Sequence, residues 1–139
     1  MPNWCENRLT VEGSVADVTK FREEAKPADN ENDLSWKTDL SLNKLYPVPE
    51  DEADNAYHWC IAHWGTKWDV EAGLDCDDEG YLEYTFDSAW SPPVAWLEEV
   101  SKKFPTLDFR LKYDDPANGF LGIAKAKAGI VRDDALSYY

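Results

Sequence analysis

The sequence predicts an α+β protein, a split βαβ sandwich in which an antiparallel sheet carries its helices on one face. Two strand–helix–strand units predict this fold class, one over residues 3–45 and one over residues 81–128. Size and composition agree with it. A chain of 139 residues that is 43% hydrophobic and 14% aromatic has enough apolar side chains for the core of one compact domain without disulfide or metal support.

The first unit begins with a strand over residues 3–12, whose polar and apolar side chains alternate. The parity expected to face the core is Cys5, Asn7, Leu9 and Val11. Ser14 is a suitable N-cap for a helix over residues 15–26, with Asp17 as the acidic partner of a capping box. Pro27 ends this helix, because its ring prevents continuation.

A polar loop is expected at residues 28–35 and a weaker strand at about residues 36–45. Leu40 and Leu42 alternate with polar neighbours in the latter segment, which favours a strand there. Pro47 and Pro49 close it.

The middle of the chain predicts a helix followed by a hairpin. Residues 55–64 indicate a short helix that Gly65 ends. Residues 68–76 alternate like a strand, residues 77–80 form a turn, and residues 81–88 return as a second strand.

The last unit predicts a helix and two strands. Ser91 is expected to cap a helix over residues 92–104 that starts with two prolines. Residues 106–114 and 120–128 alternate as strands, whereas residues 129–139 indicate no element. The side chains expected to face inward on the first of these strands are Leu107, Phe109, Leu111 and Tyr113.

Several short segments together resemble one known family. They are Met1–Asn7, the pair Pro47 and Pro49, Trp64–Asp69, Ser88–Pro93, and Tyr113–Pro116 with Gly119 and Phe120. On these segments the chain resembles the YubB-type proteins of plasmids and prophages over roughly residues 1–122. The resemblance implies a ferredoxin-like domain, without an iron–sulfur cluster, in a mobile-element (phage or plasmid) protein of the bacterial cytosol. It implies no activity and no catalytic residue.

We therefore expect a single ferredoxin-like domain over residues 1–139, with an acidic helix-and-hairpin insertion at about residues 47–80. The first seven residues carry neither a basic nor an apolar region, so no secretion signal is expected. No apolar run is long enough for a membrane span. Three cysteines without framework spacing suit reduced thiols, and together these features indicate a cytoplasmic protein.

The charge is strongly acidic and unevenly distributed. With 14 Lys+Arg and 28 Asp+Glu, the net charge of −14 argues against non-specific binding of duplex nucleic acid and points to a cationic partner. Twelve carboxylates against Lys67 alone give residues 47–87 a net charge of −11.

The acids expected to bind a partner lie in the hairpin segment, and all but Asp78 are odd-numbered, which places them on one face of two strands. They are Asp69, Glu71, Asp75, Asp77, Asp78, Glu79, Glu83 and Asp87.

We expect a non-enzymatic mobile-element accessory protein that binds a basic surface of a host or defence protein through this acidic face. The most specific version of this hypothesis is a mimic of nucleic acid that acts like an anti-CRISPR protein. A solvated face that only keeps the protein soluble is the plainer interpretation. The alternative function is an enzyme or small-ligand-binding protein with a pocket near His58, His63 and Trp68; an oligomer-forming structural module is a third. No cofactor, metal, membrane or direct nucleic-acid partner is expected.

Other patterns are weaker. Asp75, Asp77, Glu79 and Gly80 match half of a calcium loop, but Phe86 stands where its bidentate glutamate belongs. His58, Cys60 and His63 lack a fourth zinc ligand.

Two side-chain groups also suggest surfaces. The aromatic residues at 57–68 and Trp90 are expected to fasten helices to the sheet rather than to form a ligand platform. A basic patch is expected on the open sheet face, where it suits nucleic acid but lacks the aromatic strand motif of RNA-binding modules. It comprises Arg8, Arg110, Lys112, Lys125 and Lys127.

Overall fold

The computed structural model describes residues 3–27 and 38–137. In this part of the chain, six strands form one antiparallel sheet with the order β2-β3-β1-β4-β5-β6. The strands are β1 (Trp4–Glu12), β2 (Ala72–Asp78), β3 (Tyr81–Ala89), β4 (Asp108–Asp115), β5 (Phe120–Lys127) and β6 (Ile130–Ser137). The helices are α1 (Val15–Ala25), α2 (Leu42–Leu45), the 3-10 helix η1 (Glu50–Asn55), α3 (Ala56–His63) and α4 (Val94–Lys103). The expected α+β class is confirmed.

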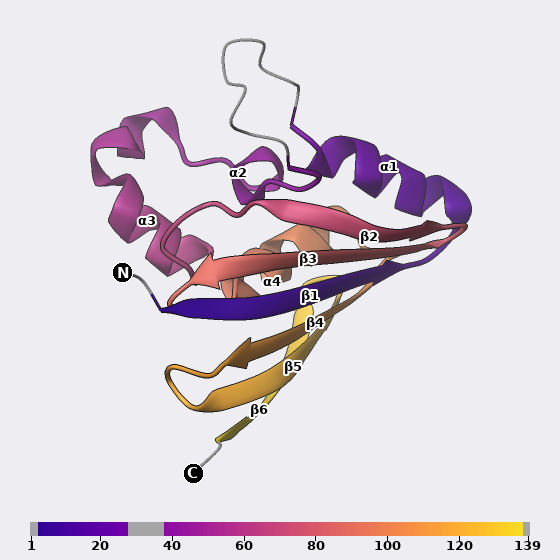
Figure 1. Cartoon of the computed structure of the whole chain (residues 1–139). Coiled ribbons are helices and arrows are strands. Elements are labelled where there is room, and N and C mark those ends of the chain that lie inside the picture. The colour runs from indigo at the N-terminus through magenta and orange to yellow at the C-terminus, as the bar shows by residue number, and fades with distance from the viewer. Residues whose placement is uncertain (1–2, 28–37, 138–139) are drawn as a thin grey trace.

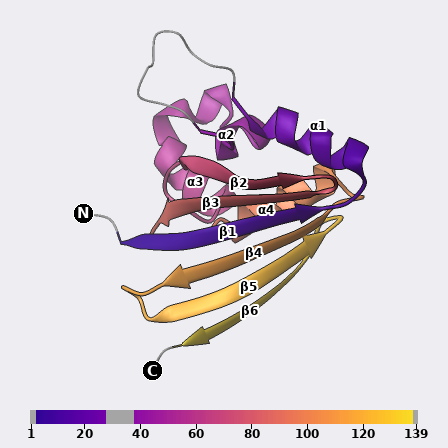
Figure 2. The same cartoon turned by 45° about the vertical axis from the view of Figure 1, so that its right-hand side comes forward.

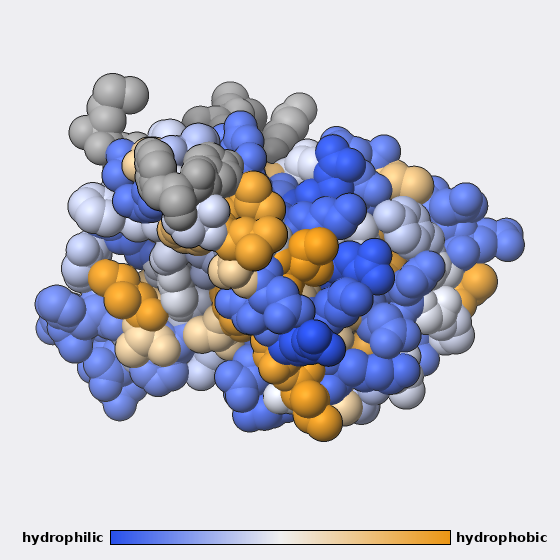
Figure 3. Space-filling view, turned by 90° about the horizontal axis from the view of Figure 1, so that it is seen from below, coloured by the Kyte–Doolittle hydropathy of each residue, from blue (hydrophilic) through white to orange (hydrophobic). Residues whose placement is uncertain are grey.

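The helices lie on one side of a twisted sheet, as Figures 1 and 2 show, and leave the other face open. Helix α1 contacts β3, and α4 contacts β4 and β5. The space-filling view of Figure 3 shows a mostly hydrophilic surface that is crossed by a band of hydrophobic residues.

The core lies between the helices and the sheet, and strand parity builds it. On β1, the side chains of the expected inward parity are buried, and so are those of Leu82 and Tyr84 on β3. Phe21 of α1 packs edge-on against Phe104 and Phe109, with ring centroids 5.2 and 5.5 Å apart. The alternation predicted for these strands is therefore confirmed.

The strand expected at about residues 36–45 is wrong for its described part. Residues 42–45 form the helical turn α2, and both Leu40 and Leu42 are buried although no strand pairs there. The amide of Ser41 donates to the Ala25 carbonyl, and its hydroxyl accepts from the Lys44 amide. These bonds satisfy the backbone locally, so no strand partner is needed. The loop expected at residues 28–35 lies outside the described residues.

The strand that follows α1 in the split βαβ arrangement is therefore β2, and not the segment at residues 36–45. It pairs with β3 at one edge of the sheet. The insertion expected at about residues 47–80 therefore contains η1 and α3 together with a strand of the main sheet.

The start of α4 also differs from the expectation. The helix begins at Val94, and Pro93 with φ −81° and ψ 60° occupies the N-cap position. Because Pro93 disfavours helical backbone at the residue before it, Pro92 stays outside the helix. Ser91 is then too early to cap it, and its hydroxyl donates to the Gly65 carbonyl instead.

Strand β6 is the one strand that the sequence did not indicate. It pairs with β5 along its whole length after a turn in which Ala128 and Gly129 have φ of 51° and 85°. Both of its faces are largely exposed, so it has no apolar alternation to recognise.

Candidate functional site

A β-bulge between Leu74 and Cys76 divides the row of acids that sequence parity placed on one face. Before it, Gly73 lies opposite Thr85 on the open face of the sheet. Beyond it, Asp77 lies opposite buried Leu82, so Asp77 faces the helices. The prediction of a single acidic face is therefore wrong for Asp77, because the extra residue at the bulge reverses which side chains of β2 face the helices.

Asp69 stabilises the fold. Its carboxylate accepts from the Ser41 hydroxyl at 2.6 Å and from the backbone amides of Leu42 and Asn43 at 2.6 and 3.2 Å. It thereby satisfies free amides at the start of α2.

Three further acids are held by neighbours within the molecule. The Asp77 carboxylate pairs with the Arg22 guanidinium of α1 at 2.6 Å, and that of Glu83 pairs with Arg8 at 3.2 Å. Asp75 accepts from the Thr85 hydroxyl at 2.6 Å.

Asp78 ends β2 and Glu79 lies in the turn before β3; both are exposed, and the Asp78 carboxylate accepts from the Glu79 amide. Gly80 completes the turn with a φ of 75°, and a Cβ there would lie 2.6 Å from the Gly13 carbonyl oxygen. Only glycine fits this position without strain.

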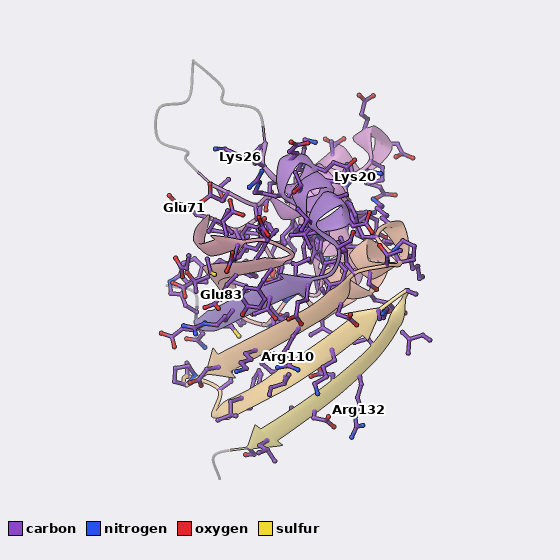
Figure 4. All side chains as sticks on the ribbon, turned by 90° about the vertical axis from the view of Figure 1, so that its right-hand side faces the viewer. Lys20, Lys26, Glu71, Glu83, Arg110 and Arg132 are labelled. Carbon is purple, nitrogen blue, oxygen red and sulfur yellow. The ribbon has the colours of Figure 1, made fainter. Side chains whose placement is uncertain are left out.

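Glu71 and Asp87 are the last two of the eight acids expected to bind a partner. Among the described residues, neither side chain has a hydrogen-bond or ion-pair partner, and both are exposed. They line a concavity of about 480 Å³ together with Trp4, Trp68 and Asp69. The structure thus brings three of the eight predicted acids, Asp69, Glu71 and Asp87, together with two aromatic residues that sequence reasoning did not connect with them. Glu71 is labelled in Figure 4, near the sheet edge formed by β2.

Exposed tryptophans mark the same end of the sheet. Trp4, Trp68 and Trp90 are 44, 45 and 53% exposed, whereas Trp59 and Trp64 are 8 and 2% exposed. The rings of Trp4 and Trp68 lie 6.3 Å apart. The prediction that aromatic residues fasten the helix at 55–64 to the sheet holds for Trp59 and Trp64, whereas Tyr57 and Trp68 are about half exposed. Trp90, expected to anchor the helix at 92–104, is exposed as well.

Trp90 has a φ of 74°, a left-handed conformation that is strained for a bulky residue. Its amide donates to the Asn3 carbonyl at 2.8 Å, and the residue is exposed. The Lys67 ammonium lies 5.2 Å from the Trp90 ring, 4.7 Å from that of Trp68 and 5.4 Å from that of Tyr57. These rings already accept one cation over their faces. We call Trp4, Trp68, Trp90, Glu71 and Asp87 the aromatic–acidic surface.

The described residues do not bring His58, His63 and Trp68, which were expected to share a pocket, into one concavity. His63 stacks on Trp59 with centroids 4.3 Å apart, and its Nδ1 lies 2.9 Å from the Trp59 carbonyl oxygen. His58 contacts the Tyr57 ring at the start of α3. Trp68 lines a concavity to which neither histidine contributes.

The described residues contain no group of three or more His, Cys, Asp or Glu that is placed to hold a metal ion. Burial raises the pKa of the Cys5 thiol to about 12 and also raises that of Cys60. Both thiols are buried, and none of the three cysteines is in a disulfide.

The expected basic patch is confirmed as a feature of the open sheet face. Its five residues line a shared concavity of about 770 Å³, and Arg132 of β6 joins them. Figure 4 shows Arg110 and Arg132 on β4 and β6, below Glu83.

Comparison with known proteins defines the class. Residues 63–138 match the family model described as "Ferredoxin-like domain in Api92-like protein", and the chain belongs to this family. The crystal structure of a protein api92 from Yersinia pseudotuberculosis is similar to the whole chain. Its TM-score is 0.73 at 12% sequence identity, covering 100% of this chain and 99% of that one. No curated protein matches the sequence. In the described residues, no helix has the length and apolar character that crossing a bilayer requires.

Proposed function

We propose that this protein is a non-enzymatic binding module that takes up a basic segment of another protein on its aromatic–acidic surface. The observation that carries this function is the concavity that the exposed Trp4 and Trp68 share with Glu71 and Asp87, whose carboxylates lack partners among the described residues. The exposed ring of Trp90 adjoins it through the Lys67 ammonium, which lies over both Trp68 and Trp90. Tryptophans dominate the energetic centres of protein interfaces, and their ring faces attract cations. Carboxylates form charge-assisted hydrogen bonds with ammonium and guanidinium groups.

The strain at Trp90 supports the same function. A left-handed backbone at a bulky residue costs about 1–3 kcal/mol and persists where the surroundings impose it. Trp90 is nevertheless 53% exposed, so the fold gains little burial in return for the strain. A partner that covers the ring would gain the apolar contact.

The proposed partner is a host or defence protein with a basic surface. In this proposal, the present protein is encoded by a mobile element and binds that partner in the bacterial cytosol. The net charge of −14 attracts such a surface over distance. Mimicry of nucleic acid needs a continuous row of carboxylates. The bulge interrupts such a row, and Asp69 and Asp77 are already bonded within the molecule. These features favour docking of a basic segment over mimicry of nucleic acid.

The test is capture of a basic partner from the bacterial host at low and high salt, followed by binding of the purified partner. Reversing Glu71 and Asp87 to Lys is expected to reduce binding at least tenfold. The matched control reverses Asp51 and Asp54, two exposed acids in η1, and is expected to retain binding better. Equal loss in both variants would show that overall charge, not this surface, binds the partner.

A further inference from the structure

The basic concavity on the open face of the sheet has a regular construction. Arg110 of β4 lies opposite Lys125 of β5, which lies opposite Arg132 of β6. The three side chains therefore form one row across adjacent strands, and two strand spacings give the row a length of roughly 10 Å. Arg8 and Lys112 lie opposite each other in the neighbouring row.

Like charges directly opposite each other in a sheet destabilise it. Among the described residues, Arg110, Lys112 and Lys125 form no ion pair, whereas the cations around them are paired. Arg8 pairs with Glu83 at 3.2 Å and Lys127 with Asp108 at 3.5 Å. The free protein thus holds unneutralised cations in the middle of the concavity.

The local charge opposes that of the whole protein. The lining contains six Lys and Arg residues and three acids, Glu12, Glu83 and Asp108, a net charge of +3 in a chain of net charge −14. A volume of about 770 Å³ lies within the usual range for small-molecule sites, about 300–1,000 Å³.

We propose that this concavity binds a small polyanion that carries two or more linked phosphate groups. Linked phosphates present several negative charges along a short chain, which matches a row of three cations. Arginine forms bidentate hydrogen bonds with phosphate oxygens, and lysine supplies a point charge. The concavity extends over β3, β1, β4, β5 and β6, and it shares no residue with the aromatic–acidic surface.

A nucleic-acid strand fits the concavity less well. Proteins that bind single strands stack successive bases on aromatic side chains. Of the two aromatic lining residues, Phe109 is buried in the core and Tyr81 donates its hydroxyl to Glu83. A long polyanion would also extend past the concavity over a strongly acidic protein, where its phosphates are repelled.

The test is calorimetric titration of the full chain with inorganic tripolyphosphate at low salt. Saturable binding at one site is expected, and replacing Arg110 and Lys125 with Gln is expected to weaken it at least tenfold. The matched control replaces Lys20 and Lys44, exposed lysines on the helical side, and removes the same charge. Because the first variant removes like charges that face each other, it is expected to fold, which thermal unfolding checks.

Three results would overturn the proposal. They are absence of wild-type binding at millimolar tripolyphosphate, equal weakening in both double variants, and tighter binding of a ten-residue thymidine oligonucleotide than of tripolyphosphate. The last result would assign the concavity to single-stranded nucleic acid. None of them bears on the aromatic–acidic surface.

Discussion

Arg22 of α1 and Asp77 of β2 form an ion pair, with a guanidinium nitrogen 2.6 Å from a carboxylate oxygen. This pair exists because the bulge after Leu74 turns Asp77 from the open face toward the helices. Asp77 thus joins the edge strand to α1.

Replacing Asp77 with Asn is expected to lower the free energy of unfolding by about 0.2–1 kcal/mol, since the pair is partly exposed to solvent. Urea denaturation of D77N, R22Q and the double variant measures the coupling between the two side chains. Zero coupling would mean that the pair does not stabilise the edge strand. Partner binding is expected to stay unchanged in all three.

Replacing Asp69 with Ala should have a larger effect. The change leaves two backbone amides and the Ser41 hydroxyl without their acceptor at the start of α2. We expect the free energy of unfolding, measured by urea denaturation, to fall by about 1–3 kcal/mol. The control, D54A, changes an exposed acid of η1 and should have little effect. Equal stability of D69A and wild type would refute the capping role.

The buried Cys5 thiol predicts a dependence of stability on alkaline pH. Burial raises its pKa from 9.0 to about 12, so the folded state favours the neutral thiol. This contribution is present below about pH 9 and is lost between about pH 9 and pH 12, because the unfolded chain loses the proton first.

The measurement compares wild type and C5A in urea at pH 8, 9, 10 and 11. Burial also raises the pKa of Tyr84 and Tyr113, so both proteins lose stability at high pH. The wild type is expected to lose more, by at most about 1.4 kcal/mol per pH unit for one proton. Parallel curves would contradict the raised pKa of Cys5.

Trp90→Gly is expected to separate stability from function. Glycine adopts a φ of 74° without strain, so thermal unfolding of W90G should occur at the wild-type temperature or higher. Binding of a basic partner should weaken, because the exposed ring is lost. W90G that is strongly destabilised would show that the ring supports the fold.

Much of the fold follows from local sequence patterns. Strands β1, β3, β4 and β5 each have one buried face, so their alternation is legible in the sequence. Strand β6 is exposed on both faces and leaves no such pattern. The sequence around Leu40 and Leu42 alternates like a strand, but bonds to α1 and to Asp69 hold it as a helical turn.

The candidate site was less predictable. Parity placed Glu71 and Asp87 on the surface correctly, yet it cannot show a one-residue bulge, and so it grouped Asp77 with them. The exposure of Trp68 and Trp90 depends on contacts between segments distant in sequence, including the bond from the Trp90 amide to Asn3. The strain at Trp90 has no sequence signal.

The central claim is that exposed tryptophans and adjacent carboxylates bind a basic segment. It is tested most directly by the indole N–H signals of the tryptophans, followed by NMR during titration with a decapeptide of alternating Arg and Lys. Signals of Trp4, Trp68 and Trp90 are expected to shift in the wild type and to stay unshifted in the E71K/D87K variant. The buried indoles of Trp64 and Trp96, which donate to the carbonyls of Tyr46 and Leu42, should not move. Unshifted Trp4, Trp68 and Trp90 signals in the wild type, or equal shifts in the variant, would contradict the account.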